Sequence, residues 1–80
     1  MGARPQHSSR YRRLCGLLRG WRTAAGLTQR DLAAKLKKPP SFVHKTEVAD
    51  RRIDPLELIA WCLACGVDPA KAIAEIRRQT

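Results

Sequence analysis

Two consecutive prolines, Pro39 and Pro40, interrupt the chain in the stretch KLKKPPSFVHK, and no other feature restricts the fold as strongly. A proline disfavours the helical conformation in the residue before it, so a helix that approaches Pro39 has to end there. Pro40 suits the first position of a new helix, because the backbone N–H at that position has no intrahelical partner. The sequence therefore predicts that one helix ends at the proline pair and that another begins at about Pro40.

Apolar residues recur at three- and four-residue steps on both sides of this join, which is the spacing of helices with one buried face. The first such segment begins at Ser9 and ends at Gly26. Its apolar positions are Tyr11, Leu14, Leu17, Leu18, Trp21 and Ala25. Arginines occupy the opposite face, so this segment is predicted to be an amphipathic helix.

Carboxylate and hydroxyl side chains mark the starts of further helices. Thr28 and Asp31 nearly match the capping box, in which two side chains satisfy the free amides of a helix start. Asp54–Glu57 repeats the arrangement, and Asp68–Pro69 places a carboxylate before a proline. The chain contains no convincing strand, so the sequence predicts an all-α fold of five short helices.

Each predicted helix after the first also has a stripe of residues expected to face inward, apolar except at Thr46 and Glu47 of the third helix. The stripe residues are Leu32, Ala33 and Leu36 in the second helix; Val43, Thr46 and Glu47 in the third; Leu56, Ile59, Ala60 and Leu63 in the fourth; and Ala72, Ile73 and Ile76 in the fifth. Residues 1–8 lack such periodicity and are basic, and are interpreted as a flexible N-terminal arm. Residues 9–80 then form one domain.

The charge of the chain indicates its partner. Sixteen Lys and Arg residues against seven Asp and Glu give a formal charge of +9. A net charge of about 2 to 8 is enough to keep a small domain soluble. Seven arginines precede Asp31 without any acidic residue, and a second basic group runs from Lys35 to Arg52. The excess predicts a polyanionic partner, most simply double-stranded DNA.

Several other classes of protein fit poorly. The chain has no nucleophile and base at a recognisable spacing, no paired carboxylates in an apolar setting and no phosphate loop, so no enzyme is expected. Cys62 and Cys65 form a C-x-x-C, but they lie in an apolar helical stretch without a second ligand pair, and are interpreted as core residues. No metal and no cofactor are therefore expected. No apolar run approaches the roughly 18 residues of a membrane span, so a cytoplasmic protein without a membrane partner is expected.

A tight join between the second and third predicted helices allows the third to project from the body. The major groove of B-DNA, about 12 Å wide, admits one helix whose first turn reaches base edges. Five short helices with this join predict a helix-turn-helix motif formed by the second and third helices.

Four stretches, GLTQRDLAAKL, SFVHKTE, ADRRID and LACGVDP, follow one another in an order and spacing that resemble the Cro and lambda-repressor type helix-turn-helix, also called the XRE family. The similarity runs from about Arg22 through Pro69. It implies a five-helix, lambda-repressor-like DNA-binding domain that binds operator DNA, usually as a symmetric dimer.

The resemblance also implies roles for individual residues. The exposed base-reading positions of the third helix are Pro40, Ser41, His44 and Lys45. Lys45 is the strongest candidate, because a lysine can donate to guanine O6 and N7. The positions implied to contact phosphate are Gln29, Lys38, Arg51 and Arg52. Arg22 and Glu47 match a buried ion pair between the third and first helices, whose role is structural.

Four residues depart from the family pattern. Lys37 and Ala49 stand where glycine is usual, so the loop after the third helix could be shaped differently. Thr46 replaces a larger apolar residue and brings a hydroxyl that needs a partner. Pro39 stands at a cap position but has no side-chain acceptor.

The leading interpretation is a sequence-specific transcriptional regulator, most simply a repressor that binds an inverted-repeat operator as a homodimer. The fifth helix is expected to form the dimer contact or to be buried within the monomer. One alternative is an antitoxin-like or adaptor protein, whose main partner is another protein such as a toxin. Another is a general nucleic-acid binder that uses its basic arm and reads no bases.

Overall fold

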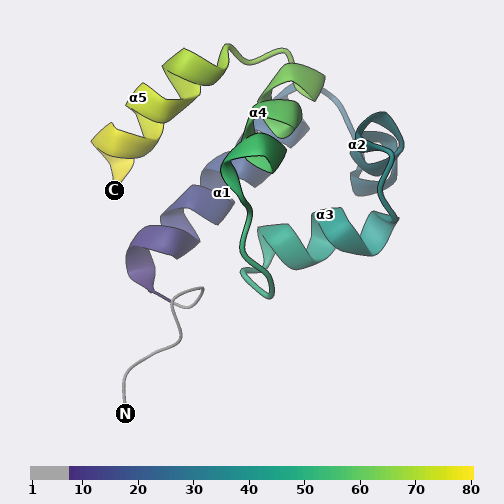
Figure 1. Cartoon of the computed structure of the whole chain (residues 1–80), viewed down its shortest axis with the longest axis horizontal. Coiled ribbons are helices and arrows are strands. Elements are labelled where there is room, and N and C mark those ends of the chain that lie inside the picture. The colour runs from purple at the N-terminus through teal and green to yellow at the C-terminus, as the bar shows by residue number, and fades with distance from the viewer. Residues whose placement is uncertain (1–7) are drawn as a thin grey trace.

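The computed structural model describes residues 8–80, and Figure 1 shows its all-helical arrangement. The described part of the chain contains no strand, and its five helices are α1 (Ser9–Ala24), α2 (Gln29–Leu36), α3 (Pro40–Glu47), α4 (Pro55–Ala64) and α5 (Pro69–Gln79). The predicted all-α fold with five helices is thereby confirmed. Most of the predicted arm, residues 1–7, lies outside the described residues, and Ser8 is the N-cap of α1.

Local capping accounts for where the helices begin. The Thr28 hydroxyl accepts from the Asp31 N–H at 3.0 Å, and the Asp31 carboxylate accepts from the Thr28 N–H at 3.0 Å. Asp54 and Glu57 make the same reciprocal pair at the start of α4. Pro39 makes no side-chain cap, as expected, and α3 instead begins with Pro40 at its first position. Capping and proline placement thus fix these helix starts within a few residues of sequence.

The core lies where α1, α2, α3 and α4 meet. Leu18, Leu32, Val43 and Trp61 are fully buried there, one from each of these helices. The Trp61 indole Nε1 donates to the Leu18 carbonyl oxygen at 3.1 Å, so the largest core side chain is also hydrogen bonded. This single interlocked core holds α3 against the body although α3 is too short to be stable alone.

The predicted stripe of α4 was wrong, because the helix is rotated relative to that expectation. Trp61 and Cys62 are fully buried. Leu56 and Leu63 instead lie on the outside, with 77% and 64% of their surfaces exposed. The helix is apolar on both sides, so its periodicity alone could not select the face that the core would accept, and the bulk of Trp61 fills the core.

The predicted stripe of α5 is divided between two environments. Ala72 is buried and Ile76 is partly buried, whereas Ile73 is 55% exposed. The helix packs against α1 and α4 through part of this stripe. Part of the stripe therefore stabilises the monomer, and Ile73 stays on the surface.

Both non-glycine turn residues adopt the left-handed conformation. The φ angle is 57° at Lys37, the C-cap of α2, and 63° at Ala49 after α3. Such a conformation costs about 1 to 2 kcal/mol for a residue with a Cβ. The Ala49 side chain offsets part of this cost, because it is buried against Tyr11 and Cys15.

The polar groups inside the core have partners. Thr46 is fully buried, and its hydroxyl donates to the Phe42 carbonyl oxygen at 2.7 Å. Within residues 8–80, no buried side-chain nitrogen or oxygen lacks a hydrogen bond. The hydroxyl of Thr46 is thus accommodated in place of the apolar volume that a larger side chain would supply.

The three cysteines are buried and unpaired, in agreement with their interpretation as core residues. Burial raises the pKa of the Cys65 thiol to about 11. Among the described residues, no cluster of three His, Cys, Asp or Glu side chains could hold a metal ion. None of the helices described is long and apolar enough to cross a membrane.

Candidate nucleic-acid interface

The turn between α2 and α3 is short and sharply defined. The left-handed backbone at Lys37 lets the Lys38 N–H donate back to the Ala33 carbonyl oxygen at 3.0 Å, which closes the end of α2. Pro39 is extended, and α3 begins at the next residue. Figure 1 shows α3 leaving α2 at a steep angle, with its length on the outside of the molecule.

The two sides of α3 differ sharply in exposure. Val43 and Thr46 are fully buried on the inner side. The four residues expected to read bases are all exposed: Pro40, Ser41, His44 and Lys45. They lie at positions i, i+1, i+4 and i+5, which fall on one side of a helix. The fold therefore presents these four side chains together to solvent.

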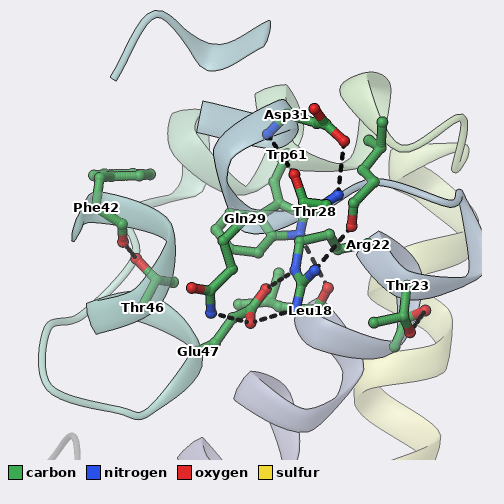
Figure 2. Close-up of polar contacts among 12 residues, drawn as sticks. Leu18, Arg22, Thr23, Thr28, Gln29, Asp31, Phe42, Thr46, Glu47 and Trp61 are labelled. Carbon is green, nitrogen blue, oxygen red and sulfur yellow. Dashed lines mark hydrogen bonds and ion pairs between the residues drawn. The ribbon is translucent and has the colours of Figure 1, made fainter. Parts of the chain in front are cut away.

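A buried ion pair fixes the C-terminal end of α3 to α1. Arg22 Nε lies 2.5 Å from Glu47 Oε2, and Arg22 Nη2 donates to Glu47 Oε1 at 3.0 Å (Figure 2). These side chains are only 10% and 2% exposed, respectively. The hydrogen bond to Glu47 raises the pKa of Arg22 further above its usual value. The pair between Arg22 and Glu47 that the sequence suggested is present in this geometry.

Gln29 joins the same group of contacts. Its Nε2 donates to Glu47 Oε1 at 3.1 Å, and the residue is half-buried at the start of α2 (Figure 2). The amide therefore joins the N-terminal end of α2 to the C-terminal end of α3. A phosphate contact from Gln29 would use the donor or acceptor capacity that this hydrogen bond leaves free.

Phe42 organises two of the cations expected to contact phosphate. The Lys38 Nζ lies 5.3 Å from the centroid of the Phe42 ring, and the Arg51 guanidinium lies 4.4 Å from it. Both distances are within the range of cation–π attraction. Phe42 thus holds a lysine from the turn before α3 and an arginine from the loop after α3 around one ring.

Arg51 is also paired within the protein. Its guanidinium donates to Glu57 through Nη1 at 3.1 Å and Nη2 at 3.3 Å, while Nη1 lies 3.4 Å from the Thr46 hydroxyl. The side chain is 32% exposed. The fork of Arg51 is therefore occupied by a carboxylate from α4, so any phosphate bound by Arg51 has to compete with Glu57.

Tyr11 holds the loop between α3 and α4 against α1. Its hydroxyl donates to the Arg51 carbonyl oxygen at 3.1 Å and accepts from the Ile53 N–H at 2.9 Å. The exposed Arg52 places its guanidinium 4.4 Å from the centroid of the Tyr11 ring. Burial raises the pKa of this tyrosine above its usual value. Of the two loop arginines, Arg52 is the one more open to a ligand.

The sequence reasoning missed Phe42, Tyr11 and Glu57 as organising residues of this surface. It placed Tyr11 only in an apolar stripe and Glu57 only in a helix cap. No local signal could have shown the loop contacts of Tyr11, because its hydroxyl bonds to residues 40 and 42 positions away. The contacts of Phe42 with Lys38 and of Glu57 with Arg51 span only four and six residues. Their roles become visible only once α1, α3 and α4 are assembled.

Comparison with known proteins agrees with this architecture. A family model described as a helix-turn-helix domain matches residues 13–72. The solved structure of an XRE-family like protein from Pseudomonas syringae pv. tomato str. DC3000 matches with a TM-score of 0.85 and 44% sequence identity, over 92% of this chain and 90% of the other. The chain belongs to the XRE-type helix-turn-helix family. A search of curated proteins found no match.

The helix-turn-helix of this XRE-type protein is α2, the turn at Lys37–Pro39 and α3. The family is one of DNA-binding regulators, and the positive charge of the chain is consistent with that class. The predicted lambda-repressor-like fold is confirmed by the match to the XRE-family structure.

Proposed function

We propose that this XRE-type protein is a transcriptional repressor that binds an inverted-repeat operator as a homodimer, with α3 in the major groove. The observation that carries the proposal is the exposed face of α3, where Pro40, Ser41, His44 and Lys45 are free of the core. A helix in the major groove reads sequence through side chains of its first turns. The inner side of α3 is buried in the core, and this holds the helix and its reading side chains in a fixed position.

The four reading positions differ in what they can recognise. Lys45 can donate to guanine O6 and N7, and a well-made contact of this kind discriminates by about 1 to 3 kcal/mol. Ser41 and His44 can each donate or accept, whereas Pro40 can make only apolar contact, for example with a thymine methyl group. Lys45 is therefore the residue most suited to select a base.

The proposed phosphate contacts surround these positions. Lys38 and Arg52 are exposed, so each is open to contact with a duplex backbone. Gln29 and Arg51 are half-buried, and each already bonds to a carboxylate of the protein. We therefore assign the main electrostatic contacts to Lys38 and Arg52. Gln29 and Arg51 serve as secondary contacts, for which Arg51 would exchange Glu57 for a phosphate.

Selection of bound duplexes from a random pool tests the proposal. The expected product is a palindromic motif, since two symmetric copies read two inverted half-sites. For the Lys45→Ala variant we expect the preference at one position of each half-site to be lost, with a change of about 1 to 3 kcal/mol in discrimination. Lys71→Ala is the matched control, because Lys71 is an exposed lysine on α5.

Two results would count against this proposal. A pool that returns no motif indicates a general nucleic-acid binder that depends on charge. A Lys45→Ala variant that selects the same bases as the unmodified protein shows that Lys45 does not read sequence. Lys71→Ala should leave the motif unchanged, and a motif that changes with it would mean that loss of charge alone alters selection.

A further inference from the structure

An exposed apolar surface lies on α4 and α5, apart from the residues proposed to contact DNA. It consists of Leu56, Ile59 and Leu63 on α4 and Ile73 on α5, and we refer to these four residues as the α4 face. They are 77%, 43%, 64% and 55% exposed, respectively. Single exposed apolar residues are ordinary, but contiguous groups of them mark interaction sites. None of these residues belongs to α3, which lies below α4 in Figure 1.

The α4 face contains both a hollow and protruding side chains. A groove of about 220 Å³ runs between α4 and α5, and its lining is entirely apolar: Pro55, Leu58, Ile59, Pro69, Ala70 and Ile73. Leu56 and Leu63 are the most exposed large apolar side chains of the described chain. Positions 56, 59 and 63 are three, four and seven residues apart, so Leu56 and Leu63 fall on one side of α4 together with Ile59 of the groove. A surface that carries a hollow and a protrusion together can be complementary to a second copy of itself.

Charge also favours a second copy at this surface. Two molecules that each carry +9 repel one another across most of their surfaces. The sequence of α4, PLELIAWCLA, contains no lysine or arginine. Asp54 lies at its N-terminal end, where Glu57 is paired with Arg51 and Arg52 lies over the Tyr11 ring of α1, whereas Lys35 and Lys37 lie beside Leu63 at its other end. Two α4 helices that run antiparallel across a two-fold axis bring Asp54 of each copy toward Lys35 and Lys37 of the other.

The exposed area suits the centre of an interface. Four side chains with these exposed fractions present on the order of 400 Å² of apolar surface, within the range of functional patches on monomers. A stable interface buries about 800 Å² on each partner, with an apolar centre and a polar rim. The α4 face therefore supplies about half of the required area, and the charged residues at its two ends supply part of the rim.

We infer that the α4 face is the surface through which two copies of this chain associate, with their α4 helices antiparallel. The inference specifies the contact surface of the homodimer in the proposed function. Only the biological use of this contact rests on that proposed function. None of the exposed reading residues of α3 belongs to the α4 face. The α4 contact differs from the expectation that the fifth helix either forms the dimer contact or is buried within the monomer, since α5 contributes Ile73 to the α4 face while its Ala72 is buried.

The test is sedimentation equilibrium of the full chain without DNA, in high salt to screen the repulsion between the copies. We expect the unmodified protein to form dimers. For the double variant Leu56→Gln and Leu63→Gln we expect the dissociation constant to rise about tenfold or more. Val48→Gln is the matched control, since Val48 is 55% exposed but lies at the end of α3, and we expect it to leave the constant within about twofold.

Thermal unfolding followed by circular dichroism shows that the variants are folded, which exposed positions should permit. A monomeric unmodified protein at all concentrations overturns the inference, and so does a double variant that dimerises as tightly as the control. The result is separable from the proposed function. If the protein dimerises but selects no motif from the pool, the inference about α4 stands and operator reading is rejected. If the protein is a monomer that selects a single half-site, base reading by α3 stands and the inference about α4 is rejected.

Discussion

Glu47 is the residue on which the position of α3 depends most. Its carboxylate accepts from Arg22 Nε, Arg22 Nη2 and Gln29 Nε2, so it joins α3 to α1 and to α2. The side chain is 2% exposed, and a buried carboxylate is tolerable only with such partners. Glu47 lies three residues after His44 and two after Lys45, so its contacts also restrain the reading positions.

Replacing Glu47 by Gln should therefore destabilise the fold strongly. The change leaves the Arg22 guanidinium buried without a counter-charge, and loss of one partner of a buried pair costs about 3 to 5 kcal/mol. The measurement is the free energy of unfolding in urea. Glu75→Gln is the control, because its pair with Arg78 lies at the surface, where solvent screens the attraction, and its loss should lower stability much less. Equal losses in the two variants would show that the buried pair contributes no more than a surface pair.

The loop between α3 and α4 gains its order from three different elements. Tyr11 of α1 hydrogen bonds its backbone on both sides of Arg52, Phe42 of α3 lies against Arg51, and Glu57 of α4 pairs with Arg51. These contacts give the two arginines different surroundings. Arg51 is directed into the protein, and Arg52 is left exposed over the Tyr11 ring.

The two loop arginines should consequently respond differently to mutation. We expect Arg52→Ala to lower the slope of log affinity against log salt by about one unit, as the loss of one phosphate contact does. Arg51→Ala should lower the slope less and the melting temperature more, because Arg51 bonds to Glu57. Duplex titrations at several salt concentrations and thermal unfolding measure the two effects. A slope change as large for Arg51→Ala as for Arg52→Ala would mean that Arg51 is a main phosphate contact and not a secondary one.

The molecule as a whole exposes its two most accessible leucines, Leu56 and Leu63, on a helix other than those of the helix-turn-helix. The reading residues of α3 and the neighbouring cations Lys38 and Arg52 lie around the helix-turn-helix, whereas α4 carries no cation and exposes Leu56 and Leu63. A small domain buries too little surface to hide every apolar residue. The exposed apolar side chains Leu56 and Leu63 lie on a helix without lysine or arginine, so this helix is suited to contact a second copy of the positively charged chain.

Footprinting on the selected duplex tests this separation of roles. We expect two protected half-sites with centres roughly 34 Å apart, one turn of DNA, because a two-fold dimer presents two α3 helices on one side of the duplex. The Leu56→Gln and Leu63→Gln double variant should protect both half-sites only at higher protein concentration. If that variant protects both half-sites at the same concentration as the unmodified protein, α4 contributes nothing to paired binding.

The starts of the helices and the class of the fold were determined by the sequence itself. Proline placement and capping pairs act within three residues, so Pro40, Thr28–Asp31 and Asp54–Glu57 mark helix starts without knowledge of the rest of the chain. The buried side of α3 at Val43 and Thr46 also followed from the sequence pattern, whereas its exposed reading positions were implied by the family resemblance. The ordered matches to a known family then indicated Arg22 and Glu47 as partners, and the structure places them in contact.

Only the tertiary structure decided which side of α4 faces inward and what Tyr11, Phe42 and Arg51 contact. The periodicity of α4 is ambiguous because both of its sides are apolar, and the bulk of Trp61 in the shared core selects one of them. The contacts of Tyr11 join residues about forty positions apart, and no local pattern encodes such pairs. Capping is a local interaction that a short stretch can specify, whereas packing depends on the shapes of several helices at once.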